Sequence, residues 1–147
     1  MINPIPTGAM ISYLKRSARI YLRNELRPYN LGSGQFPFLM ALYYKDGINQ
    51  EELARNHRYD KATIARAVQK LENEGYVSRQ RDPADRRAFL VYLTDKGRQI
   101  MPDMKRIASG WQEEMLSGFE EDEQAAVNSF LERMVRNVSS REMKTDE

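Results

Sequence analysis

The chain has 147 residues, no cysteine, one histidine and a formal net charge of +2 at pH 7. This length fits one domain, or one domain with an oligomerisation arm. The lack of cysteine excludes disulfides, thiolate metal sites and a cysteine-based redox sensor, and a single histidine does not suggest a zinc site. No apolar run approaches the roughly 20 residues that span a bilayer, and the N-terminal segment lacks a secretory pattern. We therefore expect a cytoplasmic protein without a cofactor and without membrane contact.

The charge is unevenly distributed along the chain. Residues 1–31 carry five Lys or Arg and one Glu, which gives a net charge of +4. Residues 48–98 carry eleven Lys or Arg against eight acids (+3), whereas residues 99–147 carry six against eleven (−5). A basic first part and an acidic end favour one surface that faces a polyanion and another that stays away from it. Chance scatter in a charge-rich chain is the alternative.

The first predicted element is a helix at 10–27, which closes at Pro28. Its apolar residues follow helical spacing: Met10, Ile11, Leu14, Ala18, Tyr21, Leu22 and Leu26. On another face, basic residues recur every four positions: Lys15, Arg19, Arg23 and Arg27. A second helix is expected to be capped by Ser33, with Pro37 tolerated only in its first turn, and to stop at 45–47.

Two further helices follow in close succession. Asn49 with Glu52 has the form of a capping box for a short helix, and after a turn at 56–59 a third helix runs from the N-cap Asp60 to Gly75 at C′. Three apolar residues of this third helix share a face and are expected to be buried: Ile64, Val68 and Leu71. Side chains that can bond bases or phosphates are left on its open faces: Lys61, Thr63, Arg66, Gln69 and Lys70.

A predicted β hairpin at 76–81 and 88–93 comes directly after the third helix. In its second strand, apolar residues alternate with outward-facing ones: Phe89, Val91 and Leu93. Arginines gather on its outer part: Arg79, Arg81, Arg86 and Arg87. Asp85 is expected to orient a nearby arginine through a charge-assisted hydrogen bond.

Two short helices joined by a short turn, the second capped and polar on its outer face, form a helix-turn-helix. Such a second helix presents side chains to the DNA major groove. A hairpin in the next position is a wing, and its arginine tip can reach an adjacent minor groove, where narrow A·T-rich stretches attract arginine. The order of these elements therefore predicts a DNA-binding domain.

The C-terminal part is predicted to form long helices. Thr94 caps the first, and Pro102 lies inside its apolar pattern, so we expect a kink or a delayed start there. Acids at 119–124 occupy the first turn of a last helix, where the helix dipole favours them. The apolar residues of these helices exceed what a soluble monomer exposes, which predicts a dimer: Ile100, Met104, Ile107, Trp111, Met115, Val127, Phe130, Leu131 and Met134.

From "LGSGQFPFLMAL" (31–42) through "INQEELA" and "DKATIARAVQKLENEGYVSRQRDPADRRAFLVYLTDKG" to its end, the chain resembles MarR-type winged helix-turn-helix regulators. The most specific part is "DRRA" (85–88), followed by Val91, Leu93, Thr94 and Gly97. The resemblance implies a mainly α fold with a two-stranded wing. It also implies these parts: a DNA-binding domain at 33–97, dimerisation helices at 8–30 and 98–140, and a frayed tail at 141–147.

The resemblance further implies that the helix at 60–74 reads the major groove and that a wing arginine, by the family pattern Arg87, enters the minor groove. Many members release DNA when a small aromatic acid or phenol binds between the two parts. The effector residues expected here are Tyr13, Arg16, Phe36 and Arg86. The alternative is that Arg16 belongs to a solvated basic face and Phe36 to the core.

The predicted DNA-contacting residues are Lys61, Thr63, Arg66, Gln69, Lys70, Arg79, Arg81, Asp85, Arg86 and Arg87. Together these features predict a homodimeric, sequence-specific repressor that binds a pseudo-palindrome. A winged helix used as a protein-interaction module in a larger assembly is the alternative. No residue set suggests an enzyme, because no nucleophile, histidine or glycine-rich loop accompanies either carboxylate pair.

Overall fold

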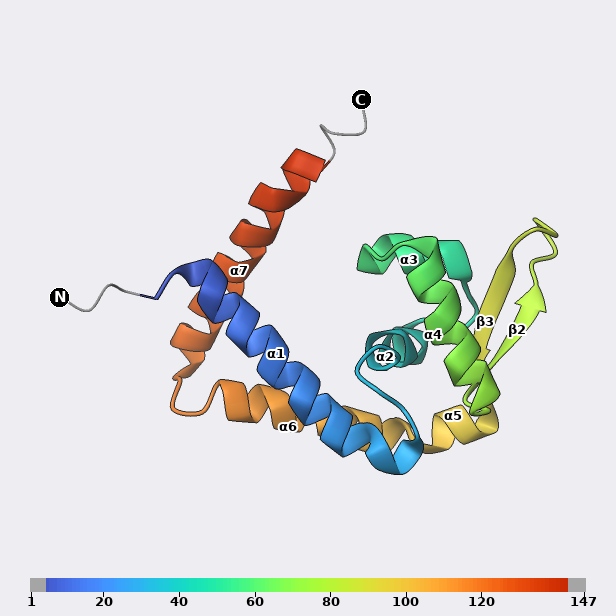
Figure 1. Cartoon of the computed structure of the whole chain (residues 1–147), viewed down its shortest axis with the longest axis horizontal. Helices are drawn as coiled ribbons and strands as arrows, with labels where there is room; N and C mark the ends of the chain where they lie inside the picture. Colours follow the sequence, from blue (N-terminus) through green and yellow to red (C-terminus); the bar gives the residue numbers. More distant parts are fainter. Residues whose placement is uncertain (1–4, 143–147) are drawn as a thin grey trace. The chain divides into compact units, whose positions relative to one another are not determined.

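The structure is a computed structural model that describes residues 5–142, with side chains placed to residue 139, and it is mainly helical (Figure 1). The elements are α1 (Thr7–Leu26), the 3-10 helix η1 (Arg27–Tyr29), α2 (Phe36–Tyr44), β1 (Ile48–Asn49), α3 (Gln50–His57), α4 (Lys61–Asn73), β2 (Val77–Arg81), β3 (Phe89–Leu93), α5 (Asp95–Gln99), α6 (Met101–Met115) and α7 (Glu121–Glu142). The chain divides into two compact units, one ending at Trp111 and one beginning at Gln112. The expected tail at 141–147 lies largely outside the described residues.

The expected hairpin is confirmed, but it belongs to a three-stranded antiparallel sheet of order β1-β3-β2. In the hairpin, Arg79 stands opposite Val91, and Arg81 stands opposite Phe89. The added strand β1 pairs Ile48 with Val91. A strand of two residues is too short to show an alternating pattern, and for this reason the sequence did not predict it.

The hydrophobic core of the first unit lies between the helices and one face of the sheet. The apolar face predicted for α4 is buried, which confirms the helical spacing. The buried residues of α4, of the sheet and of α6 are Ile64, Ala67, Val68, Leu71, Ile48, Val77, Val91, Leu93, Met101, Met104 and Ile107. This packing fixes which face of α4 is turned outward.

Short polar side chains begin the helices as predicted in three of four cases. The Asn49 carboxamide oxygen accepts from the backbone N–H of Glu51 (2.8 Å), and Asp60 accepts from that of Thr63 (2.8 Å). Thr94 caps α5 by accepting from the Gly97 N–H at 3.1 Å. Each bond satisfies a backbone donor that the first helical turn leaves without a partner.

The prediction that Ser33 caps α2 is wrong. The helix begins at Phe36, with Gln35 at the N-cap position and Pro37 in the first turn. The Gln35 side-chain oxygen accepts from the Gly32 N–H at 2.9 Å, and this closes a turn through Ser33 that delays the helix. The loop at 32–35 is therefore a separate feature in front of α2.

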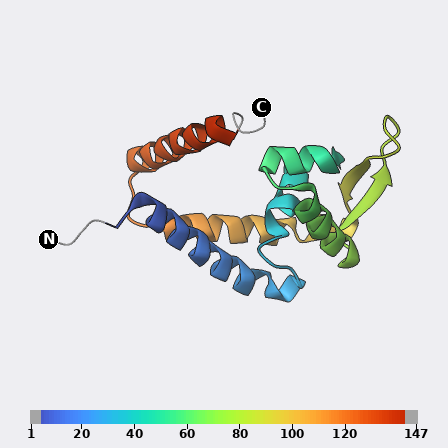
Figure 2. The same cartoon turned by 45° about the horizontal axis from the view of Figure 1, so that its top comes forward.

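The delayed start predicted at Pro102 is confirmed, because α5 ends at Gln99 and α6 begins at Met101. Within the first unit, α1 and α6 run side by side (Figures 1 and 2). The Tyr21 hydroxyl donates to the Ile107 carbonyl at 3.0 Å, and its ring lies 5.5 Å from that of Trp111. These contacts hold α1 against α6.

Candidate nucleic-acid interface

Helices α3 and α4 and the turn between them form the expected helix-turn-helix. The turn is short because Arg58 takes a left-handed conformation (φ 54°) directly after α3, and Asp60 then starts α4. Asp60 accepts from the Thr63 hydroxyl (2.6 Å) as well as from its N–H. These hydrogen bonds lower the pKa of Asp60, so the cap is ionised at neutral pH.

The predicted contact residues on the outer face of α4 differ in their exposure and in their side-chain partners. Arg66 and Gln69 are exposed, and Thr63 is half-buried. The Arg66 guanidinium donates to the Thr63 hydroxyl oxygen at 3.3 Å, so the capping threonine also orients this arginine. Lys61 is exposed and lies 3.3 Å from Glu51, a pair that salt screens readily.

Lys70, also on an open face of α4, is held in an ion pair. Its ammonium group lies 2.9 Å from a carboxylate oxygen of Glu74, one helical turn further on. The same oxygen accepts from the side-chain amide of Asn30 at 2.7 Å. Lys70 and then Asn30 lower the pKa of Glu74, which holds the acceptor in its charged form. The C-terminal end of α4 is therefore tied to the segment after η1.

Arg79, one of the residues predicted to contact DNA, braces β2 against α4 in the structure. Its guanidinium donates to both carboxylate oxygens of Glu72 (3.2 and 3.0 Å) and to the side-chain oxygen of Gln69 (2.9 Å). The Phe89 ring lies 5.3 Å below it. The hydrogen bonds from Arg79 lower the pKa of Glu72. We call Gln69, Glu72 and Arg79 the wing clamp, because they join the hairpin to the recognition helix.

The tip of the wing is held by its own side chains. Arg81 donates to the Arg86 carbonyl oxygen at 2.7 Å and lies over the Phe89 ring at 4.6 Å. The Asp85 carboxylate accepts from the backbone N–H of Arg87 at 3.0 Å. Asp85 was expected to bind an arginine side chain, whereas the partner seen is the Arg87 backbone, because a short turn brings that N–H within reach of the carboxylate.

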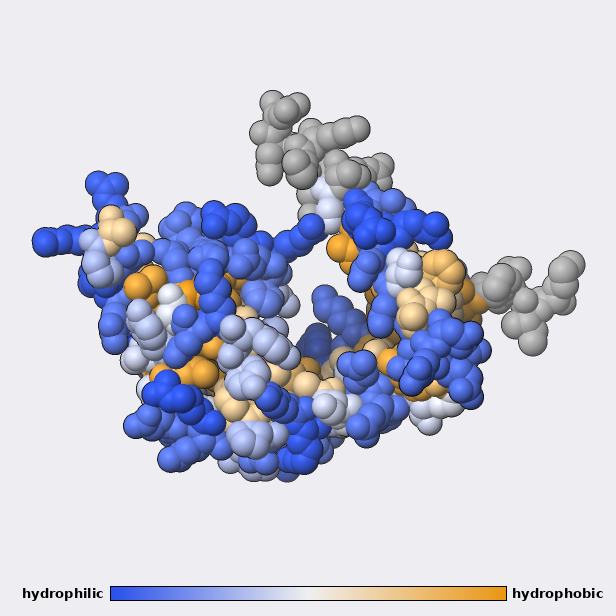
Figure 3. Space-filling view, turned by 180° about the vertical axis from the view of Figure 1, so that it is seen from behind, coloured by the Kyte–Doolittle hydropathy of each residue, from blue (hydrophilic) through white to orange (hydrophobic). Residues whose placement is uncertain are grey.

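Arg86 and Arg87 are exposed at the tip of the hairpin, and hydrophilic side chains predominate at this end of the first unit (Figure 3). The two residues lie beyond the clamp and the tip turn, which together fix the backbone that presents them. The expected set of wing arginines thus divides into two that hold the wing and two that extend from it.

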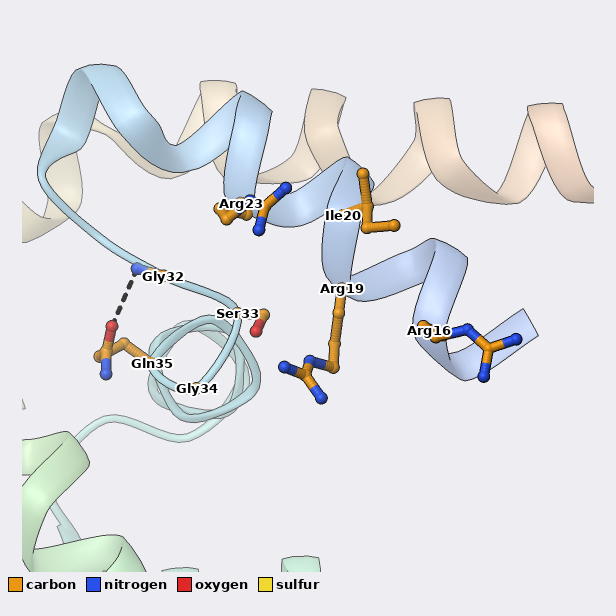
Figure 4. A pocket seen from close by; sticks show the side chains of 8 residues that line it. All are labelled: Arg16, Arg19, Ile20, Arg23, Gly32, Ser33, Gly34 and Gln35. Carbon is orange, nitrogen blue, oxygen red and sulfur yellow. Dashed lines mark hydrogen bonds between the residues drawn. The ribbon is translucent and has the colours of Figure 1, made fainter. Parts of the chain in front are cut away.

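The structure places the four expected effector residues in three different regions: Tyr13 and Arg16 on α1, Phe36 in α2 and Arg86 on the wing. Arg16 lines a cavity between α1 and the loop at 32–35 (Figure 4), and its guanidinium lies 5.7 Å from the centre of the exposed Tyr13 ring. Phe36 packs against the hydrophobic core. Arg86 is on the wing tip.

Two further arginines of α1 line this cavity, Arg19 and Arg23, and they were not among the predicted site residues. Their four-residue recurrence was visible in the sequence, but only the loop at 32–35 shows that this face encloses a space. Asp46 was missed as well. It accepts from the Leu93 N–H at 2.8 Å and so fixes the end of the wing.

Other kinds of site are not seen in the part of the chain that the structure describes. Within residues 5–142, no group of His, Asp and Glu side chains is arranged to hold a metal ion. Over the same residues, no helix is sufficiently long and apolar to cross a bilayer.

Comparison with known proteins agrees with this geometry. The sequence model of the MarR family matches residues 31–89. The HTH-type transcriptional regulator YybA of Bacillus subtilis is 32% identical over 114 residues, which cover 78% of this chain and 76% of YybA. The chain belongs to the MarR family.

Solved MarR structures cover nearly all of the fold. A MarR transcriptional regulator from Methanosarcina mazei is 51% identical, with a TM-score of 0.85 over 90% of this chain and 96% of that one. A MarR-family regulator from Listeria monocytogenes, solved with a 26mer DNA, is 25% identical, with a TM-score of 0.87 over 94% and 92% of the two chains. The MarR assignment confirms the mainly α winged-helix fold and a DNA-binding transcriptional regulator rather than an enzyme.

Proposed function

We propose that this MarR-family protein is a repressor that binds a pseudo-palindromic operator as a homodimer. In this proposal α4 enters the major groove, where Arg66 meets base edges and Gln69 does so after giving up its hydrogen bonds with Arg79 and Asn73. Arg86 and Arg87 carry the wing into the adjacent minor groove. The observation that carries it is the pairing of an outward, capped face of α4 with a clamped wing that ends in two exposed arginines. Such a protein acts in the compartment that holds the DNA, and we therefore place it in the cytoplasm.

The roles proposed for individual residues follow from their contacts. Lys61 and Lys70 suit phosphate contacts, since an ammonium group bonds phosphate without reading sequence. Thr63 orients Arg66, and Asp85 shapes the turn that presents Arg87. We assign the remaining two arginines, 79 and 81, to holding the wing in place.

The homodimer is supported by apolar side chains that the single chain leaves exposed. On α1 these include Met10, Ile11 and Leu14. On α7 they are Phe130, Leu131, Met134, Val135 and Val138. Apolar surface of this extent marks an interaction site, and a two-fold dimer supplies the second recognition helix that a palindromic site needs. We assign α1, α6 and α7 to dimerisation and residues 33–97 to DNA binding.

A small acid that binds beside α1 would release the operator in this proposal. The family resemblance implies an aryl carboxylate or a phenol, and the Arg16 guanidinium, 5.7 Å from the centre of the Tyr13 ring, offers a carboxylate partner beside an aromatic face. By linkage, a ligand that binds the DNA-free form better must lower the affinity for DNA.

Selection from a randomised duplex library, followed by fluorescence anisotropy on the selected site, tests the proposal. We expect half-sites about one helical turn apart and an affinity that falls steeply between ~50 and ~200 mM salt. Arg66→Ala should cost about 1–3 kcal/mol on the selected site and relax one base-pair position. Lys15→Ala, which removes the same charge from α1, serves as the control.

Two results would contradict the proposal. A chain that binds no duplex at ~50 mM salt would favour the protein-interaction module. Sedimentation of a monomer near 17.2 kDa at micromolar concentration would exclude the dimer and the palindromic site with it. In the proposal itself, deletion of residues 122–147 should abolish both dimer formation and recognition of the operator.

A further inference from the structure

A cavity of about 390 Å³ lies between α1 and the loop that leads into α2 (Figure 4). Three arginines, one aliphatic side chain and the glycine-containing loop line it: Arg16, Arg19, Arg23, Ile20 and Gly32–Gln35. The arginines are spaced by three and four residues, so they share one face of α1. Figure 4 shows Arg19 reaching from α1 toward the level of α2.

The positive charge of this cavity is not balanced by the residues whose side chains the structure describes. No carboxylate is part of its lining. Glu25 is the one acid of α1, and it lies 3.7 Å from Arg106 of α6 instead. Within residues 5–139, neither Arg19 nor Arg23 forms an ion pair. Like charges held together in a concave surface repel one another, and a bound anion with several charges would relieve this repulsion.

The lining also indicates which anion fits. It contains no aromatic ring, and Ile20 is its one aliphatic side chain, so an aryl acid would find little apolar wall. Guanidinium groups bind phosphate oxygens in pairs through parallel N–H donors. Arg16 and Arg23 are seven residues apart, roughly 10 Å along the helix axis. A single phosphate is too small to bond the guanidinium groups of both Arg16 and Arg23. Two linked phosphates are longer, and the flexible arginine side chains can close the remaining distance.

We propose that this cavity binds the diphosphate group of a small molecule. Arg19 holds the centre of the group, and Arg16 and Arg23 bind its two ends. The Ser33 hydroxyl, which lines the opposite wall, adds a donor. The ligand of this cavity is thus a multivalent phosphate, a class of anion distinct from the aromatic acid proposed to bind beside Tyr13.

The same region connects the cavity to the recognition helix. Asn30, two residues before the cavity loop, donates to Glu74 at the end of α4 (2.7 Å). The Tyr76 hydroxyl donates to the Tyr29 carbonyl oxygen at 2.8 Å. A shift of α1 or of the loop on binding would therefore move the C-terminal end of α4. This regulatory step rests on the proposed function, whereas binding to the cavity does not.

Isothermal titration calorimetry of the full chain tests the site, with pyrophosphate as the probe at constant ionic strength. Pyrophosphate should bind once per protomer and more tightly than phosphate or salicylate. Arg19→Gln should weaken it by about tenfold or more, and the matched control Lys15→Gln, which removes a charge outside the lining, should leave it unchanged. ADP carries the same group on a nucleoside, so its affinity relative to pyrophosphate tells a free diphosphate from an ester.

Binding that survives Arg19→Gln, or that falls equally in Lys15→Gln, would overturn the site. So would salicylate binding tighter than pyrophosphate. The double variant of Arg86 and Arg87 to Gln should keep its pyrophosphate affinity, and a loss there would place the ligand on the wing instead. Circular dichroism of each variant checks that it is folded.

DNA anisotropy tests the coupling. Pyrophosphate should lower wild-type affinity for the selected duplex by about fivefold or more at fixed ionic strength. Asn30→Gly keeps the left-handed backbone (φ 55°) and removes the bond to Glu74, so it should bind pyrophosphate normally but lose this effect. If pyrophosphate lowered the DNA affinity of Asn30→Gly as much as that of the wild type, the Asn30–Glu74 hydrogen bond would not connect the cavity to α4. Pyrophosphate binding that depends on Arg19, in a chain that binds no DNA, would refute the proposed function and leave the site standing.

Discussion

Replacing Glu72 by Gln removes the negative charge of the wing clamp but keeps the size of the side chain. In the wild type, Arg79 meets Glu72 through two hydrogen bonds of 3.0 and 3.2 Å. The two side chains are 22% and 33% exposed, so solvent screens the pair only in part. A pair of this kind lies between an exposed ion pair, worth 0.2–1 kcal/mol, and a buried one. We expect Glu72→Gln to lower the free energy of unfolding by about 1 kcal/mol at pH 7.

The pH dependence distinguishes this cause from a general loss of packing. Arg79 lowers the pKa of Glu72 in the folded protein below its ordinary value of 4.5. The pair therefore stabilises the fold above that value, and its contribution is lost as the pH falls through the folded-state pKa. The difference between wild type and Glu72→Gln should be largest near pH 7 and should shrink as the pH falls through the lowered folded-state pKa of Glu72.

Urea denaturation followed by circular dichroism at one fixed protein concentration measures this difference, since the stability of a dimer depends on concentration. Glu113→Gln, at an exposed position of α6, is the matched control and should leave stability unchanged throughout. A difference that does not shrink as the pH is lowered from 7 into the acid range, or that is absent at pH 7, would refute the role given to the clamp.

Three further predictions concern a close backbone contact, a helix cap and the wing tip. Gly97→Ala should destabilise the fold by about 2–4 kcal/mol in thermal melts, because the added Cβ would overlap the backbone carbonyl oxygen of Tyr76; a melting temperature equal to wild type would contradict this. Asp60→Ala should lower the melting temperature by about 2–4 °C through loss of the cap, while Asp60→Asn, which can still accept, should recover most of it. Replacing Arg86 and Arg87 by Ala should reduce the salt slope of DNA binding by roughly 3–4 per dimer, at about −0.9 per lost charge, with the melting temperature unchanged; an unchanged slope would remove the wing from the interface.

Features decided by neighbours in the sequence were predictable. Asp60 and Thr94 cap helices because a short acceptor precedes an apolar repeat, and such a bond spans three residues. The prediction that Ser33 caps α2 was wrong for a reason that is also local. Gln35 supplied a competing acceptor for the same turn, and the sequence does not show which of the two bonds forms.

Features decided by distant contacts were not predictable in the same way. Arg79 has the position of a DNA contact in the sequence, and its capture by Glu72 depends on how the hairpin lies on α4. The cavity beside α1 depends on where the loop at 32–35 lies, although the recurrence of Arg19 and Arg23 was plain in the sequence. The repeated pattern therefore marked a charged face, and the fold determined what that face encloses.

The order β1-β3-β2 leaves two strand edges with backbone groups that another chain could pair with, a common start of aggregation. The first edge is only two residues long, Ile48–Asn49. The second is β2, which carries Arg79 and Arg81 at alternate positions, and charge on an edge strand discourages sheet extension. By this rule we expect these arginines also to oppose association of chains through the wing edge. A hairpin engineered to be neutral would be expected to lose solubility during folding, before any effect on gene control could be measured.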